Sequence, residues 1–168
     1  RRPDMGKKVQ RIGIVTGGGD CPGLNAIIRA ATKLAINRYR LEVFGVEDGF
    51  EGLVEDRIRP LTWETTSGIM TAGGTILGAN NKANPFNYPV LLDDKREMRD
   101  VSQRCLEVAE RRGLDGLVVA GGDGTMTICR KMAERGLPII GVPKTIDNDL
   151  PGTDWTVGFD TAVGTATF

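Results

Sequence analysis

The most constraining feature of this sequence is one local pattern that occurs twice. An apolar run over residues 9–16 leads into three consecutive glycines, and a second run over residues 114–120 leads into Gly121, Gly122 and Asp123. After each glycine turn, apolar residues recur at helical spacing. Strand, glycine turn and helix in this order predict parallel strands connected by helices. We therefore expect an α/β fold, with a mainly parallel sheet and helices on both faces.

Weaker patterns predict the elements between and beyond these turns. Two further strands are expected, over residues 42–47 and 137–142. Helices are expected over residues 23–39, 96–112 and 125–135, with a turn or short helix over 48–53 and a short helix over 62–69. Residues 80–89 are polar, contain two prolines and are expected to be irregular. Residues 1–8 are interpreted as a disordered lead-in, and residues 9–168 as one domain of a fragment that is cut off within a helix.

Composition excludes several classes of function. The 168 residues carry a net charge of zero, so attraction to nucleic acid or to an anionic membrane is not expected. The chain has no histidine, which excludes serine–histidine and cysteine–histidine catalysis within it. Its three scattered cysteines favour a reduced, cytoplasmic protein, with Cys105 and Cys129 as core residues. No apolar run is long enough to span a membrane.

The first glycine turn, over residues 17–23, allows two interpretations. It is not a phosphate-binding P-loop, because Leu24 stands where that motif has its lysine. It could be a tight connection between a strand and a helix. It could also be an anion cradle around Gly18, since backbone amides at the N-terminus of a helix hold phosphate well.

The second glycine turn is the more specific of the two. Gly122 and Gly124 would let a phosphate chain lie against the backbone. Asp123 could bind Mg²⁺, which prefers one or two carboxylates together with phosphate oxygens. The alternative is that Asp123 only caps the following helix, and Thr125 could equally be a cap or a phosphate contact.

A third cluster follows the strand predicted over residues 137–142. Lys144 is a mobile point charge suited to phosphate, unless it is an ordinary surface lysine. Asp147 could accept a proton from a substrate hydroxyl, and Asp149 could assist it or orient a metal. The alternative for both carboxylates is a role in capping the loop. Ligands of open α/β sheets bind at the carboxyl ends of strands, where all three clusters are expected.

These residues resemble the successive motifs of the 6-phosphofructokinase family, in the family's order and over nearly the whole chain. The string Pro-x-Thr-Ile-Asp-Asn-Asp is especially specific. The segments that carry the resemblance are residues 16–25, 73–78, 121–125 and 143–149. The resemblance implies a three-layer, Rossmann-like nucleotide-binding half of such an enzyme. It also implies magnesium-dependent transfer of a phosphoryl group to the 1-hydroxyl of fructose 6-phosphate in glycolysis.

The resemblance also implies roles for single residues. Those implied to contact the phosphoryl donor are Gly18, Asn81, Lys82, Gly122, Asp123, Gly124, Thr125 and Lys144. Asp123 would ligate magnesium. Those implied at the sugar and the transferred phosphate are Thr145, Ile146, Asp147 and Asp149, with Asp147 as the general base. Asn81 stands where many members have arginine, so Lys82 would supply that charge without a bidentate fork.

The family includes users of ATP and users of pyrophosphate, and this chain combines their signatures. Pyrophosphate users typically have aspartate at the position of Gly124 and lysine at that of Lys144, whereas ATP users of the bacterial type have glycine at both. An aspartate at position 124 would place bulk and negative charge where the α-phosphate lies. Because glycine leaves that space open, we expect ATP as the donor, with pyrophosphate as the alternative.

Two other classes share part of the pattern. Lipid and dinucleotide kinases share Gly-Gly-Asp-Gly-Thr but lack the Pro-x-Thr-Ile-Asp-Asn-Asp string and the first glycine turn. A non-catalytic, nucleotide-sensing subunit is the second alternative, against which the intact Asp123 and Asp147 argue. Members of the resembled family are substantially longer than this chain. The resemblance also implies a homo-oligomer at full length. Because this chain is so much shorter, we expect no activity from the 168-residue piece alone.

Overall fold

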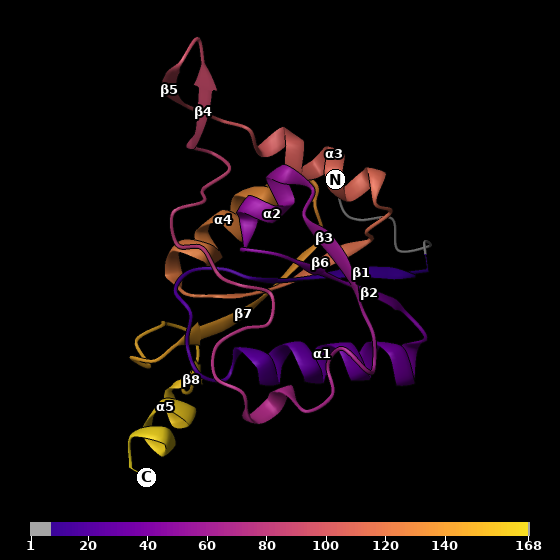
Figure 1. Cartoon of the computed structure of the whole chain (residues 1–168), viewed down its shortest axis with the longest axis vertical. Helices are drawn as coiled ribbons and strands as arrows, with labels where there is room; N and C mark the ends of the chain where they lie inside the picture. The colour runs from indigo at the N-terminus through magenta and orange to yellow at the C-terminus, as the bar shows by residue number, and fades with distance from the viewer. Residues whose placement is uncertain (1–7, 168) are drawn as a thin grey trace.

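The computed structural model describes residues 8–167, and the main feature of that part is one six-stranded sheet (Figure 1). Its strands are β1 (Arg11–Thr16), β2 (Glu42–Val46), β3 (Ile58–Leu61), β6 (Gly116–Gly121), β7 (Ile139–Thr145) and β8 (Val157–Gly158). They lie in the order β3-β2-β1-β6-β7-β8. All neighbouring pairs are parallel except β2 and β3, which are antiparallel. The mainly parallel sheet expected from the sequence is confirmed.

Helices cover both faces of this sheet, as predicted (Figure 1). The helices are α1 (Leu24–Tyr39), α2 (Phe50–Glu55), α3 (Ser102–Arg111), α4 (Asp123–Glu134) and α5 (Phe159–Ala166), with a single 3₁₀ turn η1 (Ile69–Thr71). Helix α1 and η1 lie on one face, and α2, α3 and α4 on the other. Each face has its own apolar cluster. The cluster under α1 includes Ile14 and Ile28, both fully buried.

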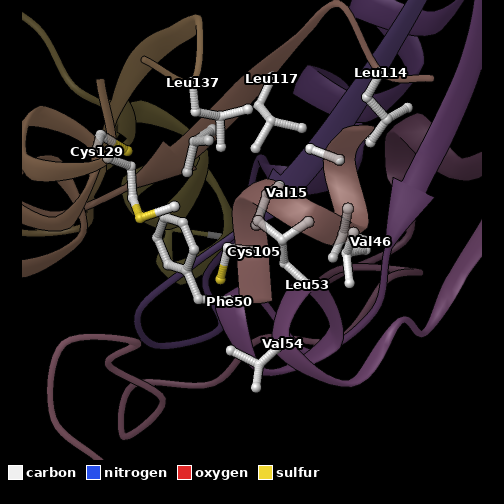
Figure 2. Close-up of a cluster of buried hydrophobic side chains, with 14 of the residues drawn as sticks. Val15, Val46, Phe50, Leu53, Val54, Cys105, Leu114, Leu117, Cys129 and Leu137 are labelled. Carbon is white, nitrogen blue, oxygen red and sulfur yellow. The ribbon is translucent and has the colours of Figure 1, made fainter. Parts of the chain in front are cut away.

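The larger cluster lies between the sheet and helices α2, α3 and α4, and Figure 2 shows its side chains. Val15 and Val46 contribute from the strands and Phe50 from α2. Cys105 of α3 and Cys129 of α4 also belong to this cluster, and burial raises the pKa of each thiol to about 12. Both cysteines are therefore neutral core residues, as the sequence predicted.

The helix predicted over residues 96–112 is wrong in its first turn and a half. Its start is a strand, β5 (Lys95–Arg99), which pairs with β4 (Tyr88–Leu92) in a separate hairpin. Asp93 and Asp94 both have positive φ, 47° and 61°, as a two-residue hairpin turn of type I′ requires. The side chain of Asp100 then accepts the backbone N–H of Ser102, where α3 begins. Met98, which lies in this hairpin and not in a helix, is 55% exposed.

The short helix predicted over residues 62–69 is also absent. Thr62 and Thr65 exchange hydrogen bonds between hydroxyl and backbone N–H, at 2.8 and 3.2 Å. Such local bonds offer the backbone an alternative to helical bonding. The segment is a series of turns, and only η1 follows it. Strand β3, which the sequence did not predict, lies just before it.

Several boundaries also differ from those expected. Strand β7 continues to Thr145, so Lys144 and Thr145 lie on the strand itself and not in a turn after residue 142. The irregular stretch predicted over residues 80–89 is confirmed up to Asn87. Of the predicted lead-in, residues 1–7 lie outside the described residues, as does Phe168 at the end of the predicted final helix. Among residues 8–167, no helix has the length and apolar character needed to cross a membrane.

Candidate active site

The site is positioned by the point at which the order of strands reverses. From β1 the chain passes to β2 on one side, and β6 pairs with β1 on the other. The two glycine turns follow β1 and β6, so they lie side by side, and the N–H of Gly17 donates to the carbonyl of Ala120 at 2.8 Å. A cleft of about 680 Å³ opens there. Such a switch point is where open α/β sheets bind their ligands.

At two positions beside the cleft, the side chain of Thr125 lies so close to the backbone that only glycine fits. A Cβ added at Gly121 would lie 2.5 Å from that side chain, and one added at Gly17 would lie 2.8 Å from it. Thr125 itself is 6% exposed. These two glycines therefore serve packing, because they let the first turn of α4 sit against both strand ends.

Two other glycines have no such requirement. A Cβ added at Gly19 or at Gly124 would meet no atom of the described residues within 4 Å, and both residues line the cleft. A Cβ at Gly18 would lie 3.6 Å from the Nζ of Lys144. The backbone at Gly19 and Gly124 therefore leaves open space in the cleft that Lys144 also lines. A phosphate chain lying against the backbone would need such space.

The N-terminus of α4 lies at the same cleft. Gly122 is the N-cap and Asp123 the first helical residue, so the alternative that Asp123 or Thr125 caps the helix is wrong. Asp123 is exposed. The unpaired N–H groups of a first helical turn carry partial positive charge and attract anions. The exposed carboxylate beside them suits a divalent cation that a phosphate brings with it.

Lys144 is buried, which rules out the ordinary surface lysine. It is 5% exposed, and its Nζ donates to the carbonyl of Gly19 at 2.5 Å. The ammonium group therefore reaches from β7 across to the first glycine turn. The sequence suggested a mobile charge at Lys144, but burial on a strand and this hydrogen bond hold the side chain in place.

The loop after β7 is held by Asn148, which has a positive φ of 52°. Its Oδ1 accepts the N–H of Thr156 at 2.8 Å, and its Nδ2 donates to the carbonyl of Asp154 at 3.3 Å. The N–H of Asp147 donates to the hydroxyl of Thr145 at 3.1 Å. These bonds place the exposed Asp147 in the wall of the cleft, where a base could meet a substrate hydroxyl.

The structure brings most of the predicted site residues to one cleft. Those that line it are Gly18, Asn81, Gly122, Gly124, Thr125, Lys144, Thr145, Ile146 and Asp147. Lys82, Asp123 and Asp149 are not among the lining residues. Asp123 nevertheless stands between two residues that are. No group of three or more acidic, cysteine or histidine side chains within residues 8–167 could hold a metal ion, so a cation at Asp123 would need oxygens from a ligand.

Sequence reasoning missed several lining residues. Thr127, Ile128 and Lys131 share the cleft with Gly124, and their spacing of three or four residues along α4 was a signal that could have found them. Phe50 comes from the start of α2, and no local pattern indicated it. Cys21 also lines the cleft. Burial raises the pKa of its thiol, and the nearby charge of Lys144 offsets part of that effect.

This sheet and its cleft define an α/β domain that binds ligands at the carboxyl ends of parallel strands. The family model described as phosphofructokinase matches residues 11–168. The chain belongs to the phosphofructokinase family. Among curated relatives, the ATP-dependent 6-phosphofructokinase 2 of Clostridium perfringens is 49% identical over 164 residues, which are 97% of this chain and 45% of that protein. Its counterpart in Streptomyces coelicolor is 45% identical over 94% of this chain and 43% of its own length.

Solved structures agree with this assignment. The phosphofructokinase of Pichia pastoris in the T-state matches with a TM-score of 0.78 and 31% identity, over 95% of this chain and 17% of that one. A pyrophosphate-dependent phosphofructokinase from Marinobacter aquaeolei matches at 0.69 over 90% of this chain and 37% of that one. At 21% identity, this second likeness shows the fold alone. The chain spans less than half the length of the curated relatives it matches.

Proposed function

We propose that this chain is the donor-binding half of a 6-phosphofructokinase. The reaction is the transfer of the γ-phosphoryl group of ATP to the 1-hydroxyl of fructose 6-phosphate, which gives fructose 1,6-bisphosphate and ADP. The observation that carries the proposal is the convergence of an open glycine at position 124, buried Lys144 and exposed Asp147 on one cleft. Relatives named as ATP-dependent 6-phosphofructokinases support it.

Each group has one task in this reaction. The carboxylate of Asp147 accepts the proton of the sugar 1-hydroxyl while that oxygen attacks the γ-phosphorus. The bond between the γ-phosphorus and the β–γ bridging oxygen breaks, and ADP leaves. Lys144 and the N–H groups at the start of α4 stabilise the charge on the donor oxygens. Thr145 and Ile146 line the sugar side of the cleft beside Asp147, with Asp149 nearby in sequence.

Magnesium fits the residues on this face. Asp123 would hold it together with phosphate oxygens of the donor, and Mg²⁺ when bound neutralises charge on those phosphates. Asn81 lines the cleft and Lys82 follows it directly, and both would meet the nucleotide side of the donor. The full-length protein is proposed to be a homo-oligomer of the cytoplasm, without nucleic acid or membrane partners.

Pyrophosphate is the second candidate donor, because Lys144 matches the pyrophosphate signature. Gly124 favours ATP over it. No atom of the described residues lies within 4 Å of a Cβ added there, so the backbone leaves room for an α-phosphate. Calorimetric titration of the chain with ATP and with pyrophosphate, each with and without Mg²⁺, tests both donors. We expect binding of ATP that depends on Mg²⁺, and preferential binding of pyrophosphate would reverse the assignment.

The phosphoryl transfer itself needs the protein at the length of its relatives. The 168-residue chain is expected to form no fructose 1,6-bisphosphate, since it spans less than half the length of the relatives named for this activity. In the completed protein, replacing the base in Asp147→Ser should lower kcat by roughly 10²- to 10⁴-fold while ATP binding is largely kept. An unchanged kcat would remove Asp147 from the mechanism.

A further inference from the structure

One wall of the cleft is formed by residues of the irregular segment 78–83, in which the side chain of Asn80 makes three hydrogen bonds. Asn80, Asn81 and Ala83 line the cleft, as does Asn84 just beyond the segment. The segment belongs to no helix and to no strand of more than a single bridge. Its shape must therefore come from side chains and not from a regular hydrogen-bond ladder.

Asn80 uses its side-chain oxygen within the segment. That Oδ1 accepts the N–H of Lys82 at 2.7 Å and the N–H of Ala83 at 3.2 Å. This is the arrangement of an Asx turn, which fixes the backbone of the two following residues. The backbone of Asn80 also forms a parallel bridge with Gly17, in the first glycine turn. Asn80 thus joins the wall to the part of the cleft proposed to hold the donor phosphates.

The side-chain nitrogen of Asn80 has a different partner, the carboxylate of Glu51 in α2. Its Nδ2 donates to Glu51 Oε2 at 2.6 Å. Arg57 lies 3.5 Å from the same oxygen and also pairs with Asp48, so the carboxylate is itself held between two donors. Hydrogen bonds to a charged acceptor are about twice as strong as neutral ones. Glu51 itself lies outside the lining of the cleft, and Asn80 is the lining residue to which it is hydrogen-bonded.

We infer that Glu51 is a positioning residue for the donor site, acting through the amide of Asn80. The carboxylate selects the side-chain orientation in which Nδ2 points to α2 and Oδ1 points to the N–H groups of Lys82 and Ala83. That orientation keeps Asn81 and Ala83 in the wall of the cleft. The inference rests on the proposed function in one respect, which is that the cleft binds ATP.

The experiment measures two quantities on the 168-residue chain. One is the Kd for ATP with Mg²⁺, by calorimetry. The other is the amide hydrogen exchange of Lys82 and Ala83 without ligand. Glu51→Ala removes the acceptor, and we expect a Kd about tenfold higher and exchange about tenfold faster at both amides. Glu55→Ala is the matched control. It removes a carboxylate from the same helix and from the same Arg57, but the side-chain amide of Asn80 donates to Glu51 and not to Glu55.

A swap of donor and acceptor separates positioning from general stability. Asn80→Asp should weaken binding, because it places a carboxylate against Glu51. Adding Glu51→Gln to Asn80→Asp restores one donor and one acceptor at the same place, with the direction of the hydrogen bond reversed. We expect this double variant to recover most of the amide protection of Lys82 and Ala83 that Asn80→Asp loses, whereas two independent destabilising changes would add. Amide exchange is the readout for this pair of changes, because a carboxylate at position 80 lines the cleft and would itself repel phosphate. Urea unfolding of each variant identifies any that are not folded.

The outcomes divide cleanly between the two proposals. If the unaltered chain does not bind ATP, the proposed function fails, and the exchange of Lys82 and Ala83 alone decides the role of Glu51. If ATP binds but Glu51→Ala changes neither quantity, the positioning role is wrong. It is equally wrong if the double variant is as impaired as the sum of its two single changes.

Discussion

The two glycine turns begin with similar sequences but present different chemistry to the cleft. After β6, helix α4 begins at Asp123, directly behind Gly122, so its N-terminus reaches the cleft. After β1, residues 20–23 separate the glycines from α1, which begins at Leu24. Its N-cap, Gly23, has a φ of 91° and lies against Gly158 instead of the cleft. The first turn therefore offers a loop, and the carbonyl of its Gly19 is bound by Lys144.

This difference assigns the two turns separate tasks. The second turn supplies a helix N-terminus, which attracts phosphate by its partial positive charge. The first turn supplies no such terminus at the cleft and instead holds the ammonium group of Lys144. The anion cradle predicted around Gly18 therefore stays a prediction, and it would use loop amides and Lys144 of β7 instead of a helix N-terminus.

The largest effect is expected where a glycine of the second turn serves packing. Gly121→Ala would place a methyl group 2.5 Å from Thr125 and should lower the free energy of unfolding by about 2–3 kcal/mol. Gly124→Ala is the matched control, since the space around it is open and alanine favours helix, so stability should be kept. Urea unfolding measures both. Equal losses of stability in the two variants would contradict the division of the glycines into packing and ligand positions.

The next largest effect is expected from removing the positive charge of Lys144, which binds the first turn. Lys144→Met keeps most of the buried volume but removes the ammonium group, and leaves the carbonyl of Gly19 without this donor. Hydrogen bonds to charged groups contribute about 1.5–3 kcal/mol, so the Kd for ATP should rise by about ten- to a hundredfold. Calorimetry with ATP and with pyrophosphate checks this. A loss limited to pyrophosphate would show that Lys144 serves the shorter donor.

The sequence predicted the parallel sheet, the helices on both faces and nine of the nineteen lining residues, because these follow from short local patterns. Apolar runs, glycines and charged residues at strand ends are all visible within about ten residues of one another. It failed over residues 62–69 and 95–99, where threonine hydroxyls and two left-handed aspartates override helical patterns. It could not find Phe50 or the bond of Asn80 to Glu51, because these join segments that only the tertiary fold brings together.

A substitution at Thr125 tests whether this residue, which packs against both turns, also contacts the bound ligand. Thr125→Val keeps the shape that fits between Gly17 and Gly121 but removes the hydroxyl. We expect nearly unchanged stability and a Kd for ATP about fivefold higher, from the loss of one hydrogen bond to phosphate. Calorimetry and urea unfolding of the same variant separate the two. Unchanged binding would restrict Thr125 to packing.

The smallest effect concerns Cys21, which stands in the loop that only the first turn has. Burial raises the pKa of this thiol, so at pH 7 its thiolate fraction is below that of an ordinary cysteine. Alkylation by iodoacetamide should be slow at pH 7 and rise about tenfold per pH unit up to that pKa, because the thiolate is the nucleophile. Mass spectrometry should find Cys21 modified before Cys105 and Cys129, whose pKa values of about 12 keep them neutral throughout.

Because Cys21 lines the cleft, saturating ATP should slow its modification. Modification at an equal rate with and without ATP would mean that the nucleotide leaves the first turn uncovered, and the second turn alone would then account for donor binding.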